Sequence, residues 1–130
     1  MEYGSGEIAR LANISLRQAQ WWDERDVVSP RQVGHRRMYE DEEALTVMVV
    51  AELRRKGLSL QRLRAALRNV RWDRLYASPS RVYLLTDGGM FTFVESDHQK
   101  IISLFERTER RFYLVCVSDL IAKLIDRKAA

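Results

Sequence analysis

The most informative segment of the sequence is Ile14-Ser15-Leu16-Arg17-Gln18-Ala19-Gln20-Trp21-Trp22. It predicts a helix, because Ser15 is a favourable N-cap and the residues after it form helices readily. Just upstream, residues 6–13 predict a short amphipathic helix that ends at Asn13. A short helix, a tight turn and a second helix with polar side chains at its start form the helix-turn-helix pattern.

The polar side chains of the second helix predict contact with DNA. Arg17, Gln18 and Gln20 can make paired hydrogen bonds to purine edges in a major groove. Ser15, at the same end of the helix, is a further candidate contact. On another face, Leu16 and Ala19 lie three residues apart and are expected to pack against a neighbouring helix.

The composition indicates a globular protein of one domain, or one and a half. The chain has 130 residues, of which 46% are hydrophobic, and no apolar run approaches the roughly 20 residues that cross a bilayer. Its first residues lack the basic start and apolar core of a signal peptide. The single cysteine, Cys116, cannot form an internal disulfide, so we expect a cytoplasmic protein with no membrane partner.

The charge balance is modestly basic. The net charge is +4, and only four of the 22 basic residues are lysines. Arginine offers a fixed fork for phosphates and guanine, although a GC-rich genome produces the same bias. Composition alone therefore leaves nucleic-acid binding open.

A wing is predicted after the second helix, made of two short strands and a basic loop that contains glycine. The predicted strands are residues 27–29 and 35–39, with a turn at 31–34 between them. Such a wing places Arg36 and Arg37 against a phosphate backbone beside the groove. His35 is a further candidate for phosphate contact, although a lone histidine is more often a bystander.

A long helix is predicted next, because acids occupy its start and cations its end, as the helix dipole favours. It runs from the acidic residues 40–43 to the basic residues 54–56, carries an apolar stripe, and ends at Gly57 as a left-handed cap. Ser59 caps a following helix with apolar residues on one face, namely Leu60, Leu63, Leu67 and Val70.

As a set, these motifs resemble the N-terminal winged-helix domain of MerR-type transcription regulators over residues 3–70. The motifs keep the family's order and spacing, and they are Glu7-Ile8-Ala9, Ser15-Leu16-Arg17, Trp21-Trp22, Val28-Ser29-Pro30, Arg37-Met38-Tyr39, residues 53–60 and Leu63. In such regulators the second helix enters the major groove and the wing grips flanking phosphates. The resemblance implies these roles for Arg17, for Trp21 or Trp22, and for Arg37 and Tyr39.

Two departures from the family pattern concern the second helix. Gln20 stands where the family usually has an arginine, and its amide is suited to reading adenine. Trp21 and Trp22 stand where it usually has two tyrosines, and an indole N–H can donate to a phosphate but cannot accept. Because adjacent side chains on a helix point about 100° apart, we expect one tryptophan in the core and Trp22 exposed toward a phosphate.

The second half of the chain does not show the long pairing helix that usually follows this domain in MerR-type regulators. Its pattern predicts a β-β-α-β-α unit, with strands at 81–86, 90–94 and 111–117 and helices capped by Ser96-Asp97 and by Ser118-Asp119. We therefore predict an α+β fold. Its expected parts are a winged-helix domain at residues 1–72, a linker at 73–80 and a small domain at 81–130.

The C-terminal unit is too small to be expected to close its own core. A unit of about fifty residues rarely does so, and the strand at 111–117 is apolar on both faces. We therefore expect the unit to pack against a second copy, which would give a homodimer suited to an inverted-repeat operator. Packing against its own N-terminal domain is the alternative.

Patterns typical of catalysis or metal binding do not stand out. There is no recognisable nucleophile–base pair, phosphate-cradling glycine loop or carboxylate pair, so we expect neither an enzyme nor a cofactor. Cys116 is expected in the core and His98 has no clustered ligands beside it, so no metal site is expected. Aromatic residues are also expected in the core, with a small-molecule pocket as the alternative, and they are Tyr76, Tyr83, Phe91, Phe93, Phe112 and Tyr113.

We interpret the chain as a homodimeric, sequence-specific transcription regulator that binds double-stranded DNA. The resemblance also implies distortion of promoter DNA, which makes RNA polymerase a candidate partner. One alternative is a DNA-binding adaptor or antitoxin whose C-terminal domain binds a partner protein. Another is an excisionase-like architectural factor that bends DNA with little sequence preference.

Overall fold

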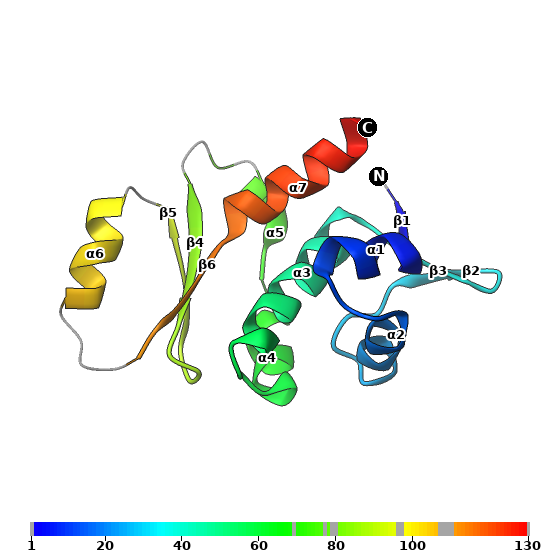
Figure 1. Cartoon of the computed structure of the whole chain (residues 1–130), viewed down its shortest axis with the longest axis horizontal. Helices are drawn as coiled ribbons and strands as arrows, with labels where there is room; N and C mark the ends of the chain where they lie inside the picture. The colour runs from blue at the N-terminus through cyan, green and yellow to red at the C-terminus, as the bar shows by residue number, and fades with distance from the viewer. Residues whose placement is uncertain are drawn as a thin grey trace.

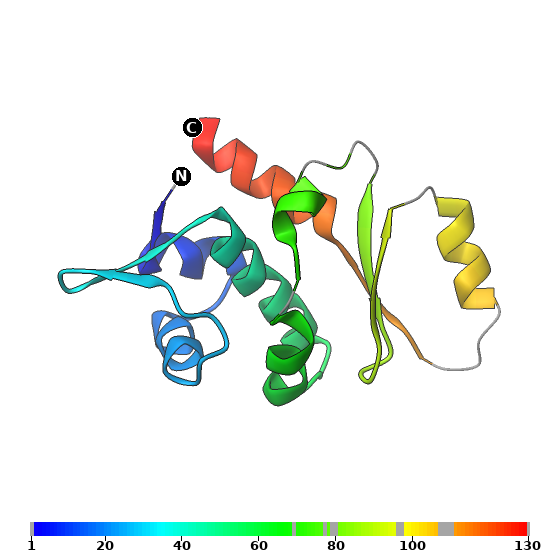
Figure 2. The ribbon, with the colours of Figure 1, turned by 180° about the vertical axis from the view of Figure 1, so that it is seen from behind.

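The computed structural model describes residues 2–68, 70–76, 78, 81–95, 98–106 and 111–129. Within these residues the backbone forms two three-stranded antiparallel sheets, one in each half of the chain. The helix α3 (Asp41–Arg55) lies between the helix-turn-helix on one side and the second sheet on the other (Figures 1 and 2).

The N-terminal half contains the predicted helix-turn-helix and a wing. Its helices are α1 (Ser5–Ala12) and α2 (Leu16–Glu24), and its strands are β1 (Tyr3–Gly4), β2 (Arg31–Val33) and β3 (Arg36–Tyr39). The strands pair in the order β1-β3-β2, so β1 adds a third strand that the sequence did not indicate. Gly34 takes a φ of 64° in the two-residue turn between β2 and β3, a conformation that glycine adopts freely.

The first wing strand is not where the sequence predicted it. Residues 27–29 follow the turn at 25–26 that ends α2 and form no strand, and the strand is at residues 31–33, where a turn was expected. The reason lies in the packing of the turn, because the Val27 N–H donates to the Trp22 carbonyl at 2.9 Å and the Val28 side chain is buried in the core. The β-branched residues at 27 and 28 therefore serve burial rather than strand pairing.

The long central helix is confirmed in both its ends. Glu40 and Glu43 form a reciprocal capping box at the start of α3, and Gly57 follows its end with a φ of 98°. The apolar surface is wider than the predicted stripe, since α3 is covered on two sides, and its buried residues are Ala44, Leu45, Val47, Met48, Val49, Val50, Ala51 and Leu53. Ser59 caps α4 (Leu60–Leu67) by accepting from the Arg62 N–H, as predicted.

The C-terminal half has the predicted β-β-α-β-α order, preceded by a short helix. Its elements are α5 (Trp72–Tyr76), β4 (Val82–Thr86), β5 (Phe91–Glu95), α6 (His98–Glu106), β6 (Tyr113–Cys116) and α7 (Val117–Ala129). The sheet order is β5-β4-β6, so β4 is the central strand and is buried along its whole length. The predicted caps Ser96-Asp97 lie outside the described residues.

Both faces of this second sheet are covered by the same chain. Alternate residues of β4 point to opposite faces, as a strand requires. Val82 and Leu84 join the main core, which also contains α3 and α7, while Tyr83 and Leu85 pack in a smaller core with Ile101 of α6. In Figure 1 the sheet accordingly stands between α6 on one side and the α3 and α7 layer on the other.

The argument that this unit needs a second copy to cover its sheet is therefore wrong. The alternative, packing against its own N-terminal domain, is what the structure shows, and the main core runs from Tyr3 to Leu124. Part of the predicted linker also packs against this core, because Leu75 of α5 is partly buried against it. Trp72 of α5 is buried and meets Phe93 edge to face, with ring centroids 5.6 Å apart. We therefore propose one shared core in place of two domains joined by a linker.

The last helix begins two residues earlier than a cap at Ser118 predicts. Ser118 lies inside α7, and its Oγ accepts the Val82 N–H at 2.8 Å, which ties the start of α7 to the central strand β4. Cys116, expected in the core, is only partly buried against the smaller core, and its Sγ accepts a hydrogen bond from Arg81 at 3.0 Å.

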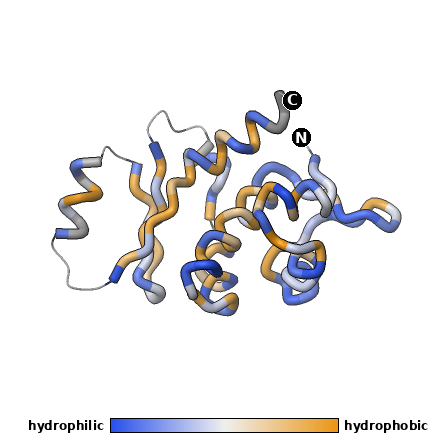
Figure 3. Tube along the Cα trace, in the orientation of Figure 1, coloured by the Kyte–Doolittle hydropathy of each residue, from blue (hydrophilic) through white to orange (hydrophobic). Residues whose placement is uncertain are grey.

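Hydrophobic residues concentrate where helices and sheets pack against one another. Figure 3 shows hydrophobic segments along α3 and the second sheet, and mainly hydrophilic colours on the wing. Among the described residues, no helix combines the length and the apolar character that a membrane crossing requires.

Tyr3 makes the fold sensitive to alkaline pH. Its side chain is fully buried and its hydroxyl donates to Asp41 Oδ1 at 3.0 Å. Burial, and then this hydrogen bond, raises the pKa of Tyr3 to about 12. A tyrosine in an unfolded chain ionises near pH 10, so above that pH the unfolded chain loses a proton that the folded chain keeps. The stabilisation from Tyr3 is therefore complete below about pH 10 and is lost as the pH rises toward about 12.

We expect this group to lower the free energy of unfolding by about 1 kcal/mol between about pH 9 and about pH 11. Urea denaturation at the two pH values measures the loss, and Tyr3→Phe is the control because it removes the titrating hydroxyl. The variant should lose about 1 kcal/mol less than the unsubstituted protein over the same interval. Equal losses in the two proteins would contradict the role of Tyr3.

Candidate nucleic-acid interface

The turn between α1 and α2 is closed by backbone hydrogen bonds around Asn13. Asn13 adopts a left-handed conformation with φ 55° and ψ 51°, which asparagine tolerates better than most residues. Its N–H donates to the Arg10 carbonyl at 3.2 Å, and the Ile14 N–H donates to the Ala9 carbonyl at 2.9 Å. The predicted end of α1 at Asn13 is confirmed, and α2 can begin directly after Ser15.

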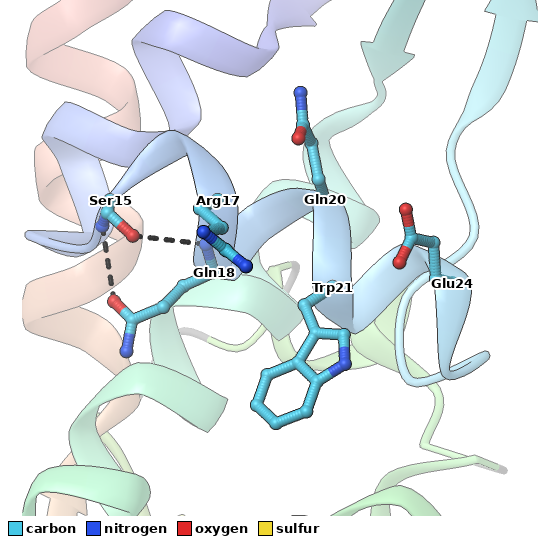
Figure 4. A pocket seen from close by; sticks show the side chains of 6 residues that line it. All are labelled: Ser15, Arg17, Gln18, Gln20, Trp21 and Glu24. Atoms are coloured by element: carbon cyan, nitrogen blue, oxygen red, sulfur yellow. Dashed lines mark hydrogen bonds between the residues drawn. The ribbon is translucent and has the colours of Figure 1, made fainter.

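Ser15 and Gln18 form a reciprocal capping box at the start of α2. The Gln18 N–H donates to Ser15 Oγ at 3.0 Å, and Gln18 Oε1 accepts the Ser15 N–H at 3.2 Å, as Figure 4 shows. Each side chain is exposed, yet the atoms that would contact DNA already hold the helix end. A paired contact of Gln18 with adenine needs its amide oxygen, so this contact requires the cap to open.

Four exposed side chains lie on the outer surface of α2 at helical spacing. They are Arg17, Gln20, Trp21 and Glu24, and with Ser15 and Gln18 they line a shallow hollow (Figure 4). Gln20 and Trp21 extend in opposite directions from the helix, so they widen the surface that α2 offers. This outer surface of α2 combines a guanidinium, a free amide and an indole, which are groups able to contact base edges and backbone.

The structure reverses the predicted orientation of the two tryptophans. Trp22 is 4% exposed and belongs to the main core, whereas Trp21 is 47% exposed and lies under the Arg25 guanidinium, 4.4 Å from the ring centroid. Ala19 and Trp22 lie three residues apart and turn the same face of α2 inward. The prediction that Trp22 is exposed is therefore wrong. Leu16, expected to pack beside Ala19, is exposed.

The cations of the wing differ in what they contact. Arg36 and His35 are exposed, and within the described part of the chain no ion pair holds Arg36. Arg31 pairs with Glu2 across the start of the sheet. Arg37 is engaged differently, because its Nε donates to Asp23 Oδ2 of α2 at 2.6 Å, and this hydrogen bond raises the pKa of Arg37.

Tyr39 does not reach the surface, so the predicted direct contact with DNA is wrong for this residue. It lies on β3 opposite Tyr3 of β1, and its ring fills the core beneath the sheet. Burial is the main cause of the raised pKa of its hydroxyl. Tyr39 thus packs the wing against the core and does not contact a phosphate.

A link between the helix-turn-helix and α3 was missed from the sequence. The end of α3 carries Arg54 and Arg55, whose charges were assigned to the helix dipole. Arg55 donates to the Ala12 carbonyl at 3.0 Å and so caps the end of α1 as well. Arg54 and Arg55 line the same hollow as Gln18, which places them beside the start of α2. The charge run is visible in the sequence, but its partner, 43 residues away, is not.

Metal ligands do not gather within the described residues, where no three His, Cys, Asp or Glu side chains come together. Aromatic side chains of the second sheet pack in or against the two cores, and Tyr113 also lines a shallow surface hollow. Tyr83 is buried in the smaller core and Phe112 packs against it, and three others are partly buried against the main core, namely Phe91, Phe93 and Tyr113. The side chain of Tyr76 lies outside the described structure.

The geometry agrees with what comparison to known proteins finds. Residues 3–70, a little more than half of the chain, match the family model described as MerR HTH family regulatory protein. Among solved structures, a MerR-family transcriptional regulator from Bacillus cereus is similar, with 14% sequence identity and a TM-score of 0.48. That match covers 58% of this chain and 59% of the regulator's chain. No curated protein sequence matches the chain.

Proposed function

This chain belongs to the MerR family of helix-turn-helix regulatory proteins, and from that membership we propose that it binds double-stranded DNA sequence-specifically through α2 and the wing. The observation that carries the proposal is the outer surface of α2, where Arg17, Gln20 and Trp21 are exposed on a helix that Ser15 caps and Trp22 anchors in the core. A rigid helix with such an exposed surface suits insertion into a major groove.

Within this proposal each exposed side chain has a role that follows from its chemistry. Arg17 reads guanine through its fork, and Gln20 reads adenine through its free amide. Trp21 contacts the sugar-phosphate backbone with its ring and its N–H donor, while Arg36 and His35 meet flanking phosphates. Ser15 and Gln18 set the start of the helix.

The proposal includes a homodimer on an inverted repeat, but the support for it no longer comes from the second sheet. The second sheet is covered within the chain, so it does not demand a partner. The argument for two copies is that a helix-turn-helix reads a short half-site and two-fold symmetry doubles it. The proposal includes RNA polymerase as a further partner, which the DNA-bound protein would meet at a promoter whose DNA it distorts.

The test is selection of DNA ligands from a random pool, with the mass of the protein and of its DNA complex recorded in solution. The proposal expects an enriched inverted repeat, bound by two copies. An enriched single half-site bound by one copy would keep sequence reading and remove the dimer. Absence of any enriched sequence would contradict the proposal. Bending of DNA in that case would favour an architectural factor, and a stable complex with another protein would favour an adaptor or antitoxin.

Replacing Arg17 with alanine is expected to weaken binding to the selected site by about 1–3 kcal/mol and to relax the preference at one base position. The reason is that a bidentate arginine contact distinguishes guanine from the other bases. Titration of the cognate duplex and of duplexes with each base at that position measures both effects. Equal losses on cognate and random DNA would remove Arg17 from base reading.

Arg36→Ala is the matched control on the wing, because it removes the same charge from a phosphate contact. It should weaken all sequences alike and reduce the slope of log affinity against log salt by about one charge. The contrast between the two variants therefore separates base reading by α2 from backbone contact by the wing.

A further inference from the structure

The wing and α2 are joined by one partly buried ion pair. Arg37 lies on β3 opposite Gln32 of β2, and its Nε donates to Asp23 Oδ2 at 2.6 Å. The two side chains are 23% and 17% exposed, so water screens them less than it screens the exposed pairs of this protein. They are 14 residues apart in the chain and belong to the two elements proposed to contact DNA.

Asp23 is placed where a helix does not by itself favour an acid. It lies in the last turn of α2, and the negative end of the helix dipole destabilises a carboxylate there. Arg37 supplies the compensating charge from β3, and the Tyr39 hydroxyl lies close enough to interact electrostatically with both. The carboxylate thus stabilises a particular arrangement of α2 and the wing more than it stabilises the helix.

We propose that Asp23 is a positioning residue that holds the wing at a set distance from α2 through Arg37, so that base reading by α2 and phosphate contact by Arg36 occur in register. This rests on the proposed function. Arg37 then acts within the protein, and Arg36, its exposed neighbour on β3, carries the phosphate contact. Rigid spacing between two contact elements raises specificity because a mismatched site cannot satisfy both at once.

The alternative, direct contact of Arg37 with a phosphate, makes the opposite prediction for the same substitution. If Arg37 contacts DNA, Asp23→Asn removes a competing acid and frees the guanidinium, so binding to the selected site tightens. If Asp23 positions the wing, Asp23→Asn loosens it and the preference for the selected site falls. Removal of any acid near DNA also raises affinity for all sequences, so the quantity to compare is the ratio of cognate to scrambled affinity.

The first experiment measures that ratio for full-length protein on the selected duplex and on a scrambled duplex of equal length. We expect Asp23→Asn to lower the ratio about three- to tenfold, the effect of losing a partly buried pair. The matched control is Glu42→Gln, which removes one exposed acid from the first turn of α3 and should leave the ratio within about twofold. A ratio that is unchanged or raised in Asp23→Asn would overturn the proposal.

The second experiment reverses the pair. Arg37→Glu alone should lower the ratio, and Asp23→Lys combined with Arg37→Glu should restore most of the loss, because the link between α2 and β3 returns with opposite charges. If Arg37 instead contacts a phosphate directly, the double variant should not recover the ratio, because a glutamate at position 37 repels the DNA backbone whatever residue is at position 23. Interference by phosphate ethylation adds a readout that a loss of stability would not produce. In Asp23→Asn the sensitive phosphates of the wing should lose their effect, while those beside α2 keep theirs.

The two levels of the proposal fail in different ways. If the unsubstituted protein enriches no sequence, the proposed function fails and the ratio has no meaning. If it enriches a site that Asp23→Asn prefers as strongly as the unsubstituted protein does, only the positioning role of Asp23 fails.

Discussion

Replacing Trp22 with alanine is expected to lower the free energy of unfolding by about 3–5 kcal/mol, as removal of a large aromatic side chain from a packed core does. Trp22 is 4% exposed and joins α2 to the main core, and its carbonyl accepts the N–H of Val27. The loss is a large share of the roughly 5–15 kcal/mol that keeps a domain of this size folded. Urea denaturation followed by far-ultraviolet circular dichroism measures it.

Trp21→Ala is the matched control for this prediction. Trp21 is the adjacent residue and carries the same side chain, but it is 47% exposed and lies under the Arg25 guanidinium. Its removal should change stability by about 0.5–1 kcal/mol at most. Similar losses in the two variants, or a larger loss in Trp21→Ala, would contradict the observed orientation of the pair.

Replacing Leu124 with alanine is expected to lower the free energy of unfolding by about 2–5 kcal/mol. Because the two halves share a core, we expect the helix-turn-helix to be destabilised together with the second sheet. Leu124 lies near the C-terminal end of the chain on α7, is fully buried, and belongs to the same core as Tyr3, Ile8 and Trp22. Trp21 and Trp22 lie on α2, whereas Trp72 contacts Phe93 of the second sheet, so in a Trp72→Phe background the tryptophan fluorescence reports on the helix-turn-helix. A shift of the fluorescence transition would therefore show that the two halves unfold together.

Ile125→Ala is the control for Leu124→Ala, because the next residue on the same helix is 54% exposed. It should change the free energy of unfolding by about 0.5 kcal/mol or less. Two independent domains would give a different result, in which Leu124→Ala leaves the tryptophan transition where it was and shifts only a separate transition seen by circular dichroism. That outcome would restore the predicted division into two domains.

Signals that act over a few residues predicted local structure reliably. Ser15 and Ser59 cap their helices, and Asn13 and Gly57 have positive φ values at helix ends. In each case the residue acts on backbone groups within four positions of itself, so the sequence contains the whole interaction. The candidate DNA contacts Arg17, Gln20 and Arg36 remain predictions, and the structure adds that all three are exposed.

The misplaced wing strand shows where local signals stop. Val27 and Val28 have the β-branched side chains of a strand, and three residues after Pro30 have weaker strand character. The structure uses the valines to close α2 and to fill the core, and it forms the strand from residues 31–33 because β3 offers them a partner. Strand propensity is decided by neighbours across the sheet, which the local sequence does not contain.

The sequence predicted the helix-turn-helix, the long central helix, the order of elements in the second half and the family to which the first half belongs. Three features became visible only in the fold: which tryptophan is buried, the pairing of Arg37 with Asp23, and the covering of the two faces of the second sheet by α3 and α6. The two groups of features differ in how far apart along the chain the interacting groups lie. Capping and turn formation involve groups within one turn of backbone. Burial and ion pairing depend on which distant segments approach, and burial of apolar surface rewards any partner that excludes water, wherever it lies in the chain.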